Sequence, residues 1–335
     1  MMKLEQEQVM QVAQVNPVIT VSDMKPLVSI ICPVHNEEAG LQELYQRVVG
    51  VMDTLDADWE LVLVDDGSRD RSAAEIMRLY NSDVRVRGVQ LSRNFGFQIA
   101  VTAGLDVAQG DAIILMDADL QDPPEVIPQM IAQWHAGYDV VYGVRGEREG
   151  ETWFKKASAS AFYRLIRRIT SVNIPLDTGD FRLMDRRVVE SIRKMPERHR
   201  FLRGLVSWVG FKQTGVVYQR QARFAGKTSF TLGKMLRFAM DAITGFSYFP
   251  LQIASWLGFV MAIISALSIV AVVALRLFGT DAPLLGQATT LIAVLFLGSI
   301  QLICLGIIGE YLGRMYDEVK QRPLYLVQET WGVER

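Results

Sequence analysis

Two acidic motifs in the first half of the chain have the residue types of a cation and nucleotide site. Asp117 and Asp119 are separated by one residue, and Gln121 and Asp122 follow closely. Oxygen ligands of this kind suit Mg²⁺ or Mn²⁺, which commonly bridge carboxylates and substrate phosphates. The second motif, Asp-Asp-Gly-Ser at 65–68, offers two carboxylates that could hydrogen-bond a ribose or a base. Ordinary turn chemistry accounts for the Gly, Ser and Pro residues nearby but poorly for Asp117 and Asp119, so the sequence predicts a divalent-cation site.

Both motifs follow strands of a predicted α/β domain. Apolar runs predict strands at 27–34, 59–64, 84–91 and 112–116, and helical patterns predict helices at 38–55, 71–80 and 99–109. Continuous apolar strands alternating with helices indicate a mostly parallel sheet covered on both faces. Ligands of such sheets bind beyond the carboxyl ends of the strands. The polar clusters at 33–38, 65–68 and 117–122 therefore predict one site at this edge.

The charged residues are distributed unevenly along the 335-residue chain. Half of the residues are hydrophobic and 21% are charged, which excludes disordered and fibrous proteins. Residues 1–144 carry 9 Lys/Arg against 22 Asp/Glu, whereas residues 145–240 carry 21 against 8. Residues 241–335 carry only 5 against 7. This pattern indicates an acidic region, a basic region and an apolar region with separate roles.

The apolar region predicts a membrane hairpin. Residues 242–275 and 282–309 contain no charged side chain, and each run exceeds the roughly 20 residues that cross a bilayer core. We expect spans at 249–275 and 286–309. Basic residues flank the outer ends of this pair, so the positive-inside bias places the catalytic domain and both termini in the cytoplasm. No ionisable group lies at mid-depth, which favours an anchor over a transport pathway.

The remaining segments complete the predicted organisation. We expect a flexible arm at 1–24, a catalytic domain at 25–228, an amphipathic interfacial helix at 229–248 and a cytoplasmic tail at 310–335. A stretch of aromatic and basic residues at 153–169 also favours contact with the membrane interface.

Several enzyme classes are excluded by missing motifs. No Gly-rich phosphate loop follows the first predicted strand, which argues against a kinase or a dehydrogenase. No Gly-x-Ser-x-Gly nucleophile motif occurs. The two cysteines are too few for a structural zinc site or a disulfide framework.

The motifs together resemble those of family 2 glycosyltransferases. The resemblance is carried by Pro-Val-His-Asn-Glu-Glu at 33–38, Asp-Asp-Gly-Ser at 65–68, Ser-Arg-Asn-Phe-Gly at 92–96, Asp-Ala-Asp-Leu-Gln-Asp-Pro-Pro-Glu at 117–125 and Thr-Gly-Asp-Phe-Arg at 178–182. More narrowly, the chain is similar to polyprenyl-phosphate sugar transferases related to dolichol-phosphate mannose synthase, and most similar to bacterial bactoprenol glucosyltransferases. The resemblance implies a GT-A (Rossmann-like) fold, a nucleotide-diphosphate sugar donor with UDP-glucose favoured, Mg²⁺ or Mn²⁺, and a polyprenyl-phosphate acceptor in a membrane.

The resemblance also assigns roles residue by residue. The nucleotide sugar would be held by Pro33, His35, Glu37, Asp65, Asp66 and Asp117. The metal would be held by Asp117, Asp119 and Gln121. The acceptor phosphate would be held by Arg145, Lys156, Ser160, Arg223 and Lys227. The catalytic residues would be Asp119, Arg145 and Asp180.

These assignments predict a single displacement at the anomeric carbon with inversion. The acceptor phosphate oxygen is the nucleophile, and because it is already anionic near neutral pH it needs little help from a general base. Asp180 would orient the sugar or act as a residual base, unless it only caps the following helix.

Two other functions stay open at this point. A processive membrane polysaccharide synthase shares the acidic motifs, although its usual Gln-x-x-Arg-Trp element is missing because the chain contains no Arg-Trp pair. A non-enzymatic membrane scaffold or transporter subunit would have no use for those motifs. We also expect a dimer or tetramer, with the apolar residues 323–327 available for subunit contact, and no nucleic-acid partner.

Overall fold

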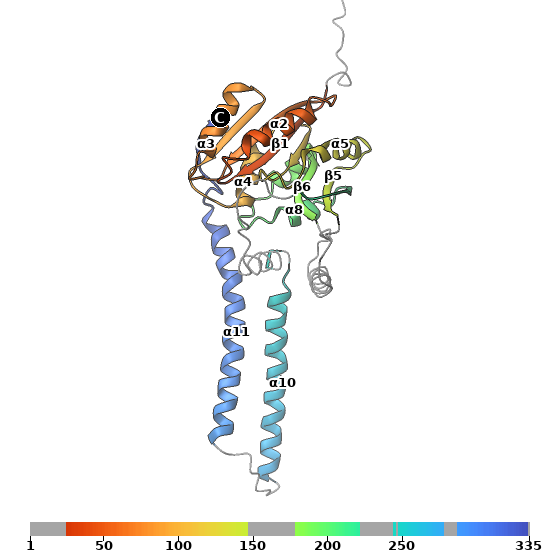
Figure 1. Cartoon of the computed structure of the whole chain (residues 1–335). Coiled ribbons are helices and arrows are strands. Elements are labelled where there is room, and N and C mark those ends of the chain that lie inside the picture. Colours follow the sequence, from red (N-terminus) through yellow and green to blue (C-terminus); the bar gives the residue numbers. More distant parts are fainter. Residues whose placement is uncertain (1–24, 147–177, 222–243, 246, 278–286, 334–335) are drawn as a thin grey trace, which may run out of the picture.

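The computed structural model describes residues 25–146, 178–221, 244–245, 247–277 and 287–333. They form an α/β body from which two long helices extend side by side (Figure 1). The stretch at 153–169 and residues 229–243 of the expected interfacial helix lie outside the described residues.

An eight-stranded mixed sheet runs through the body in the order β7-β5-β6-β4-β1-β2-β3-β8. The neighbouring strands β4, β1, β2 and β3 are parallel, β6 is antiparallel to both of its neighbours, β8 is antiparallel to β3, and β7 is parallel to β5. The strand bounds are Leu27–Val34 for β1, Asp58–Asp65 for β2, Val86–Leu91 for β3, Ala112–Leu115 for β4, Val140–Arg145 for β5, Thr178–Asp185 for β6, Gln213–Tyr218 for β7 and Val327–Trp331 for β8. The four strands expected from apolar runs are confirmed, with small shifts at their ends.

Helices cover both faces of the sheet. One core cluster packs α2 (Leu41–Met52), α3 (Ser72–Ser82) and α5 (Ile127–His135), with the short 3₁₀ helix η2 (Pro124–Val126), on the first face. The other packs α4 (Phe97–Val107), α7 (Arg186–Arg193) and α8 (Leu202–Trp208) on the second. In β1, Ile30 belongs to the first cluster and Ile31 to the second, because neighbouring side chains of a strand point to opposite faces. Burial on both faces explains why these strands are continuously apolar.

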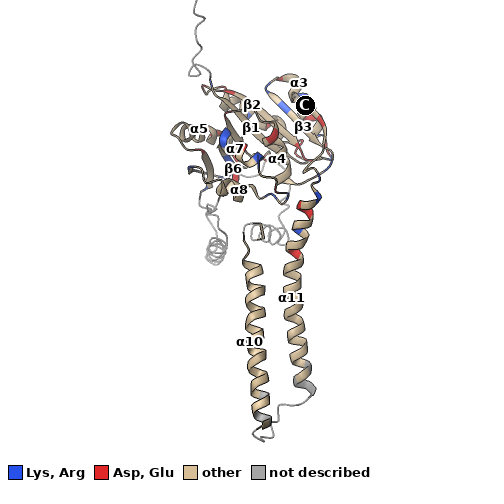
Figure 2. Ribbon diagram, turned by 180° about the vertical axis from the view of Figure 1, so that it is seen from behind, with Lys and Arg blue, Asp and Glu red and all other residues tan. Residues whose placement is uncertain are grey.

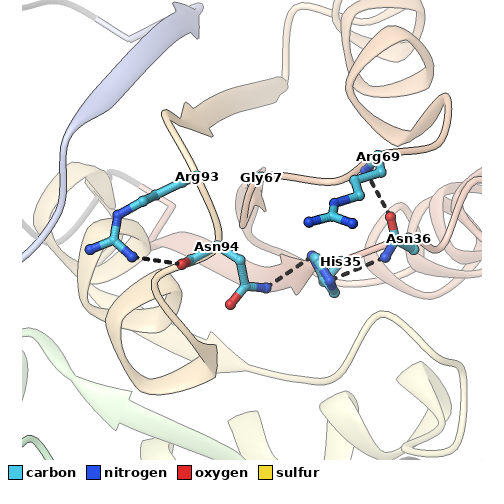
Figure 3. A pocket seen from close by; sticks show the side chains of 6 residues that line it. All are labelled: His35, Asn36, Gly67, Arg69, Arg93 and Asn94. Atoms are coloured by element: carbon cyan, nitrogen blue, oxygen red, sulfur yellow. Dashed lines mark hydrogen bonds between the residues drawn. The ribbon is translucent and has the colours of Figure 1, made fainter.

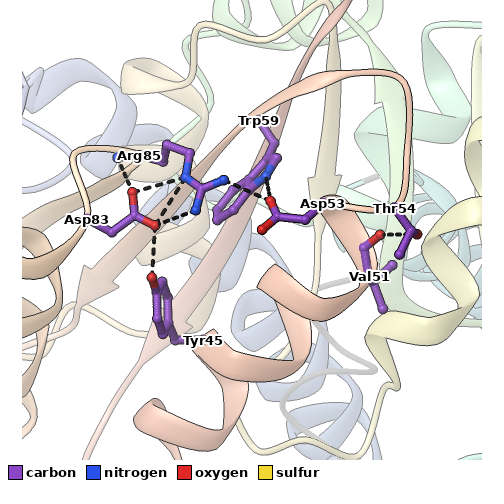
Figure 4. Close-up of polar contacts among 7 residues, drawn as sticks. All are labelled: Tyr45, Val51, Asp53, Thr54, Trp59, Asp83 and Arg85. Carbon is purple, nitrogen blue, oxygen red and sulfur yellow. Dashed lines mark hydrogen bonds and ion pairs between the residues drawn. The ribbon is translucent and has the colours of Figure 1, made fainter.

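A polar network closes the amino-terminal end of β2 and β3 (Figure 4). The Arg85 guanidinium lies 4.0 Å from the ring centroid of Trp59 and donates hydrogen bonds to Asp83 and Asp53. Tyr45 on α2 donates to the same Asp83 carboxylate at 2.8 Å. The hydrogen bonds from Arg85 lower the pKa of Asp83 to about 2 despite its partial burial. The network lies at the end of the sheet opposite to the acidic motifs, so its role is to join α2 to the sheet.

The two long helices are apolar enough to cross a membrane. Helix α10 spans Phe249–Leu277 and α11 spans Gln287–Lys320, and their most apolar stretches are not buried within the protein. At 1.5 Å per residue, each exceeds a bilayer core of about 30 Å. The charges on α11 lie near its end beside the α/β body, and the rest of the hairpin is drawn almost free of charge (Figure 2). The expectation of two apolar carboxyl-terminal helices is confirmed, and we conclude that the protein is associated with a membrane.

The chain returns from the hairpin to the sheet that it left. Helix α11 continues to Lys320, beyond the expected span end at 309, and β8 then pairs with the edge strand β3. The Ser92 amide donates to the Leu326 carbonyl at 2.9 Å, and the Tyr325 hydroxyl donates to Asp106 at 2.8 Å. The apolar residues expected to contact another subunit thus lie beside this chain's own sheet.

Candidate active site

The carboxylates of the Asp-Asp-Gly-Ser motif lie at the carboxyl end of β2. Asp65 is fully buried, and its Oδ1 accepts a 3.1 Å hydrogen bond from the Ser68 amide. Asp66 accepts hydrogen bonds from the amides of Phe95 (2.7 Å) and Gly96 (2.9 Å). Burial raises the pKa of Asp66, and these two hydrogen bonds oppose the increase. Asp66 therefore joins the loop after β2 to the loop that begins α4.

A polar pocket of about 530 Å³ opens beside this junction (Figure 3). The residues that line it are His35, Asn36, Gly67, Arg69, Arg93 and Asn94. Two guanidinium groups and two amides give it a chemistry suited to a polar, anionic ligand. Of these residues the sequence singled out only His35 as a ligand contact, although the motif at 92–96 pointed to the others on the loop after β3.

A hydrogen-bond chain fixes the His35 ring in this pocket. Its Nδ1 lies 3.0 Å from the Asp66 carbonyl oxygen, and its Nε2 lies 3.1 Å from Asn36 Nδ2. With the proton on Nδ1, the ring donates to Asp66 and Nε2 accepts from Asn36, whereas Asn94 Nδ2, 3.1 Å from the same Nδ1, can donate to it only in the other tautomer. Asn36 has φ of 57° and its Oδ1 accepts from the Arg69 amide at 2.8 Å. The pocket wall is thus ordered by its own hydrogen bonds.

Four carboxylates, those of Asp117, Asp119, Asp122 and Asp180, lie in and after the neighbouring strands β4 and β6, where their charges interact. Burial, followed by the charges of Asp122, Asp180 and Asp119, raises the pKa of Asp117 to about 8. Asp119 accepts a 3.1 Å hydrogen bond from the Gln121 amide across Leu120, whose φ is 61°. This tight turn shapes the loop that carries the acidic motif at 117–122.

Asp122 is the most enclosed member of the carboxylate group. It is fully buried, accepts a hydrogen bond from the Tyr218 hydroxyl and lies 3.8 Å from Arg220. Burial raises its pKa, opposed by Tyr218 and by the charges of Arg220 and Arg145. Asp122 therefore has a structural role, because it joins the loop after β4 to Tyr218 at the end of β7.

Asp180 in β6 is paired with an arginine that the sequence did not single out. Arg203 on α8 donates from Nε and Nη2 to the two Asp180 carboxylate oxygens, both at 2.8 Å. Burial alone would raise the pKa of Asp180, but the charge and hydrogen bonds of Arg203 hold it below its usual value. Asp185, not Asp180, caps α7 by accepting from the Arg187 amide, so the capping interpretation of Asp180 is wrong.

Arg145, the last residue of β5, borders the same carboxylates. A Cβ on Gly179 would lie 2.9 Å from Arg145 Nη2, so the guanidinium lies close above the Gly179 backbone. Its buried Nε has no hydrogen-bond partner within the described residues. Its charge lowers the pKa values of both Asp122 and Asp180. The expected phosphate-binding arginine is therefore adjacent to the expected metal site.

Comparison with known proteins identifies the family to which the chain belongs. The family model "Glycosyl transferase family 2" matches residues 29–193, and "GtrB C-terminal hairpin" matches residues 249–315. The uncharacterized glycosyltransferase YkcC of Bacillus subtilis is 52% identical over 307 residues, which cover 91% of this chain and 94% of that protein. The chain belongs to glycosyl transferase family 2. The expectations of a GT-A-like α/β fold and of a glycosyltransferase are confirmed, and the scaffold or transporter alternative is removed.

Two further proteins are similar to this glycosyltransferase. The prophage-derived bactoprenol glucosyl transferase of Shigella flexneri is 41% identical over 304 residues, covering 90% of this chain and 98% of that protein. Glucosyl-3-phosphoglycerate synthase from Mycobacterium tuberculosis, solved with Mn²⁺, UDP-glucose and phosphoglyceric acid, covers 65% of this chain and 78% of its own at 17% identity and a TM-score of 0.45.

The oxygen atoms of this site suit a divalent cation whose remaining ligands would be phosphate oxygens of the substrate. Among the described residues, no three His, Cys, Asp or Glu side chains are close enough to enclose a metal ion by themselves. Burial and then the charges of three neighbouring carboxylates raise the pKa of Asp117, and a cation would offset both effects. Asp65 and Asp122 each retain a buried carboxylate oxygen without a partner in the described part of the chain. One or two carboxylates together with substrate phosphates form a common Mg²⁺ shell.

Of the other expected site residues, some lie near the site and some lie outside the described residues. Pro33 lies in β1, and the Glu37 amide donates to Ser72 at 3.0 Å. Gln121 turns toward Gln221, and Gln121 Nε2 donates to the backbone carbonyl oxygen of Gln221 at 3.4 Å. The other acceptor-site candidates, Lys156, Ser160, Arg223 and Lys227, lie outside the described residues.

Proposed function

We propose that this protein transfers a single hexose, glucose in the favoured case, from a nucleotide-diphosphate sugar to a polyprenyl phosphate at the cytoplasmic face of a membrane. The observation that carries the proposal is the 41% identity to a bactoprenol glucosyl transferase over 98% of that protein's length. This match includes the catalytic domain and the hairpin together. The favoured donor is UDP-glucose, and the cation is Mg²⁺ or Mn²⁺.

The donor is proposed to lie across the carboxyl ends of β1, β2 and β4. The pocket around His35 and Asn94 would take the nucleoside, because it is polar and of suitable size. Asp65 and Asp66 would lie toward the ribose, with Pro33 and Glu37 at the β1 side. The diphosphate would then lie toward Asp117 and Asp119, which would hold the divalent cation with Gln121. A cation there would offset negative charge on the departing nucleoside diphosphate.

The acceptor is proposed to approach from the basic side of the site. Arg145 would bind the lipid phosphate and reduce the repulsion between two anionic reactants. A phosphate oxygen would attack the anomeric carbon as the bond from that carbon to the nucleoside diphosphate breaks, which inverts the configuration. The nucleophile is already anionic, so no side chain has to remove a proton from it. Lys156, Ser160, Arg223 and Lys227 are proposed as further phosphate contacts.

The membrane arrangement follows from the same proposal. The α10–α11 hairpin would anchor the enzyme with its catalytic domain and both termini in the cytoplasm, and the segments at 153–169 and 229–248 would bring the site to headgroup level. A homodimer or homotetramer stays our expectation.

Transfer of labelled sugar into lipid tests the proposal. Membranes containing the protein are incubated with Mg²⁺, undecaprenyl phosphate and one radiolabelled UDP- or GDP-sugar at a time, and the organic phase is counted. We expect label from UDP-glucose, lost in D119A and retained in D56A, which removes an exposed surface carboxylate paired with Lys25. Absence of lipid label with every donor would contradict the proposed acceptor, and label in a growing polymer would support the processive alternative.

A further inference from the structure

The Asp180–Arg203 pair has a geometry that restricts what Asp180 can do. Two parallel hydrogen bonds of 2.8 Å join the carboxylate to the guanidinium, and paired bonds of this kind fix the relative plane of both groups. The two side chains are mostly buried, with exposed fractions of 13% and 22%. The pair joins β6 to α8, two elements that also share one core cluster.

The backbone beneath Asp180 is held as firmly as its side chain. Arg182 is buried and donates from Nη2 to the Gly179 carbonyl at 3.0 Å and from Nε to the Asp180 carbonyl at 3.2 Å. Arg145 lies over Gly179 on the other side. Arg203 thus holds the Asp180 carboxylate, while Arg182 holds the backbone carbonyls of Gly179 and Asp180.

This fixed carboxylate lies on the strand next to β4, which the expected metal ligands follow. Strands β4 and β6 are antiparallel with Leu115 opposite Arg182, and this register continued by two residues brings Asp117 opposite Asp180. Each Asp180 oxygen already accepts one hydrogen bond from Arg203 and keeps capacity for another, because a carboxylate oxygen has two lone pairs. A carboxylate next to a guanidinium is a poor proton acceptor but a good hydrogen-bond acceptor for a hydroxyl group. The sugar moiety of the donor supplies hydroxyl groups at this place.

We propose that Arg203 is a positioning residue that holds Asp180 as the hydrogen-bond acceptor for a hydroxyl of the donor sugar. Arg203 acts on the reaction only through Asp180 and makes no contact of its own with the substrate. This inference rests on the proposed function for the nature of the donor. It assigns Asp180 to recognition of the sugar and not to removal of a proton.

The first test is independent of the acceptor. Calorimetry with Mg²⁺ measures the affinities for UDP and for UDP-glucose. The affinity for UDP-glucose divided by the affinity for UDP reports contacts to the sugar. In D180N and in R203M we expect that ratio to fall about tenfold, the usual loss of a charge-assisted hydrogen bond, while the affinity for UDP stays unchanged. Unchanged UDP binding also demonstrates a folded site. R187M is the matched control, because Arg187 makes a similar double pairing with Asp185 and Asp139 away from the site.

A double-mutant cycle distinguishes action through Asp180 from direct contact. In the transfer assay at saturating undecaprenyl phosphate, R203M should lower kcat/KM for UDP-glucose by about 100-fold, as misplacement of a positioning group can do. R203K should recover part of this loss. In the D180N background, R203M should change kcat/KM by less than about threefold, because coupled groups are not additive. Independent losses that multiply would overturn the proposal and indicate a direct contact of Arg203 with the substrate.

Deoxy donors identify the hydroxyl. For one monodeoxy analogue of UDP-glucose, binding should be the same in wild type and D180N, because the hydroxyl that Asp180 accepts is already missing. If D180N weakens binding of every deoxy analogue by the same factor, Asp180 is not a hydroxyl acceptor and the proposal fails. An absence of lipid product from the wild-type protein, with the calorimetric ratios as expected, would contradict only the proposed acceptor.

Discussion

Gly67 lies against the backbone of Arg93, and a Cβ on Gly67 would be only 2.4 Å from the Arg93 carbonyl carbon. Gly67 also has φ of 61°, a conformation that favours glycine. This contact brings the loop after β2 against the loop after β3 and forms one wall of the pocket around His35 and Asn94. The glycine of the Asp-Asp-Gly-Ser motif is therefore required by geometry.

The substitution G67A is expected to destabilise the protein by about 1–3 kcal/mol, since it adds backbone strain and a clash, and to weaken UDP binding more than tenfold. Urea denaturation and calorimetry in detergent measure the two effects. The matched control is G50A in α2, where nothing lies within 4 Å of the added Cβ and the helix should gain up to about 1 kcal/mol. Equal behaviour of the two variants would contradict this role of Gly67.

Cation binding is expected to strengthen as the pH rises toward 8. The pKa of Asp117 is raised from 3.8 to about 8, so in the cation-free folded protein this carboxylate is largely protonated at neutral pH. A divalent cation binds the ionised form and must displace the proton, so its affinity should increase about tenfold per pH unit below 8 and level off above it. Mn²⁺ titrations at pH 6, 7, 8 and 9 measure this dependence.

The stability of the cation-free protein is expected to fall as the pH rises, whereas its affinity for the cation is expected to increase. The folded-state pKa lies above the unfolded value, so without cation the folded protein binds the additional proton between about pH 4 and 8, and this contribution to stability is lost as the pH rises through that window. The increase in Tm on adding Mn²⁺ should therefore be larger at pH 8 than at pH 6. In D117N the pH dependence should disappear, and its persistence would assign it to another group.

The strand ends and their acidic motifs could be predicted because both signals are local. Apolar runs such as Leu27–Val34 locate the buried strands, and Asp65 ends β2 while Asp117 comes two residues after β4. Helix starts were less accurate. Helix α2 begins at Leu41 and not at 38, because Gly40 first closes a turn onto the Glu37 carbonyl. Helix α4 begins at Phe97 and not at 99, directly after Gly96 with φ of 97°.

The partners supplied by tertiary structure could not be predicted from spacing. Arg203 lies 23 residues beyond Asp180, and nothing in the sequence indicates that α8 packs beside β6. Tyr218 reaches Asp122 across 96 residues for the same reason. Strands β5, β6, β7 and β8 were not predicted, and β8, Val327–Trp331, follows a membrane helix and has a mostly exposed pattern.

Arg145 provides a test of the acceptor site. R145A should raise the KM for undecaprenyl phosphate by about 10- to 100-fold, the range for loss of a hydrogen bond to a charged group, with UDP-glucose binding nearly unchanged. R145K should be intermediate, because it retains the charge without the guanidinium geometry. R71A removes an exposed arginine as a control. Loss of donor binding in R145A would argue against the assignment.

Trp331 tests whether the returning strand supports the catalytic domain. Its side chain is buried against Gly88 in β3, so W331A is expected to cost about 3 kcal/mol in the free energy of unfolding. W208A, which truncates an exposed tryptophan on α8, should change it by less than about 0.5 kcal/mol. Similar effects of both changes in urea denaturation would mean that β8 does not stabilise the domain.

The central claim is that one hexose is joined to the phosphate of a polyprenyl lipid, and ³¹P NMR of the reaction measures this directly. Purified protein in detergent is supplied with Mg²⁺, undecaprenyl phosphate and UDP-glucose. We predict that the lipid phosphomonoester signal is replaced by a phosphodiester signal, with one UDP released per lipid and one hexose in the product mass. A phosphomonoester signal that persists while UDP is released, or a lipid that carries several hexoses, would contradict the account.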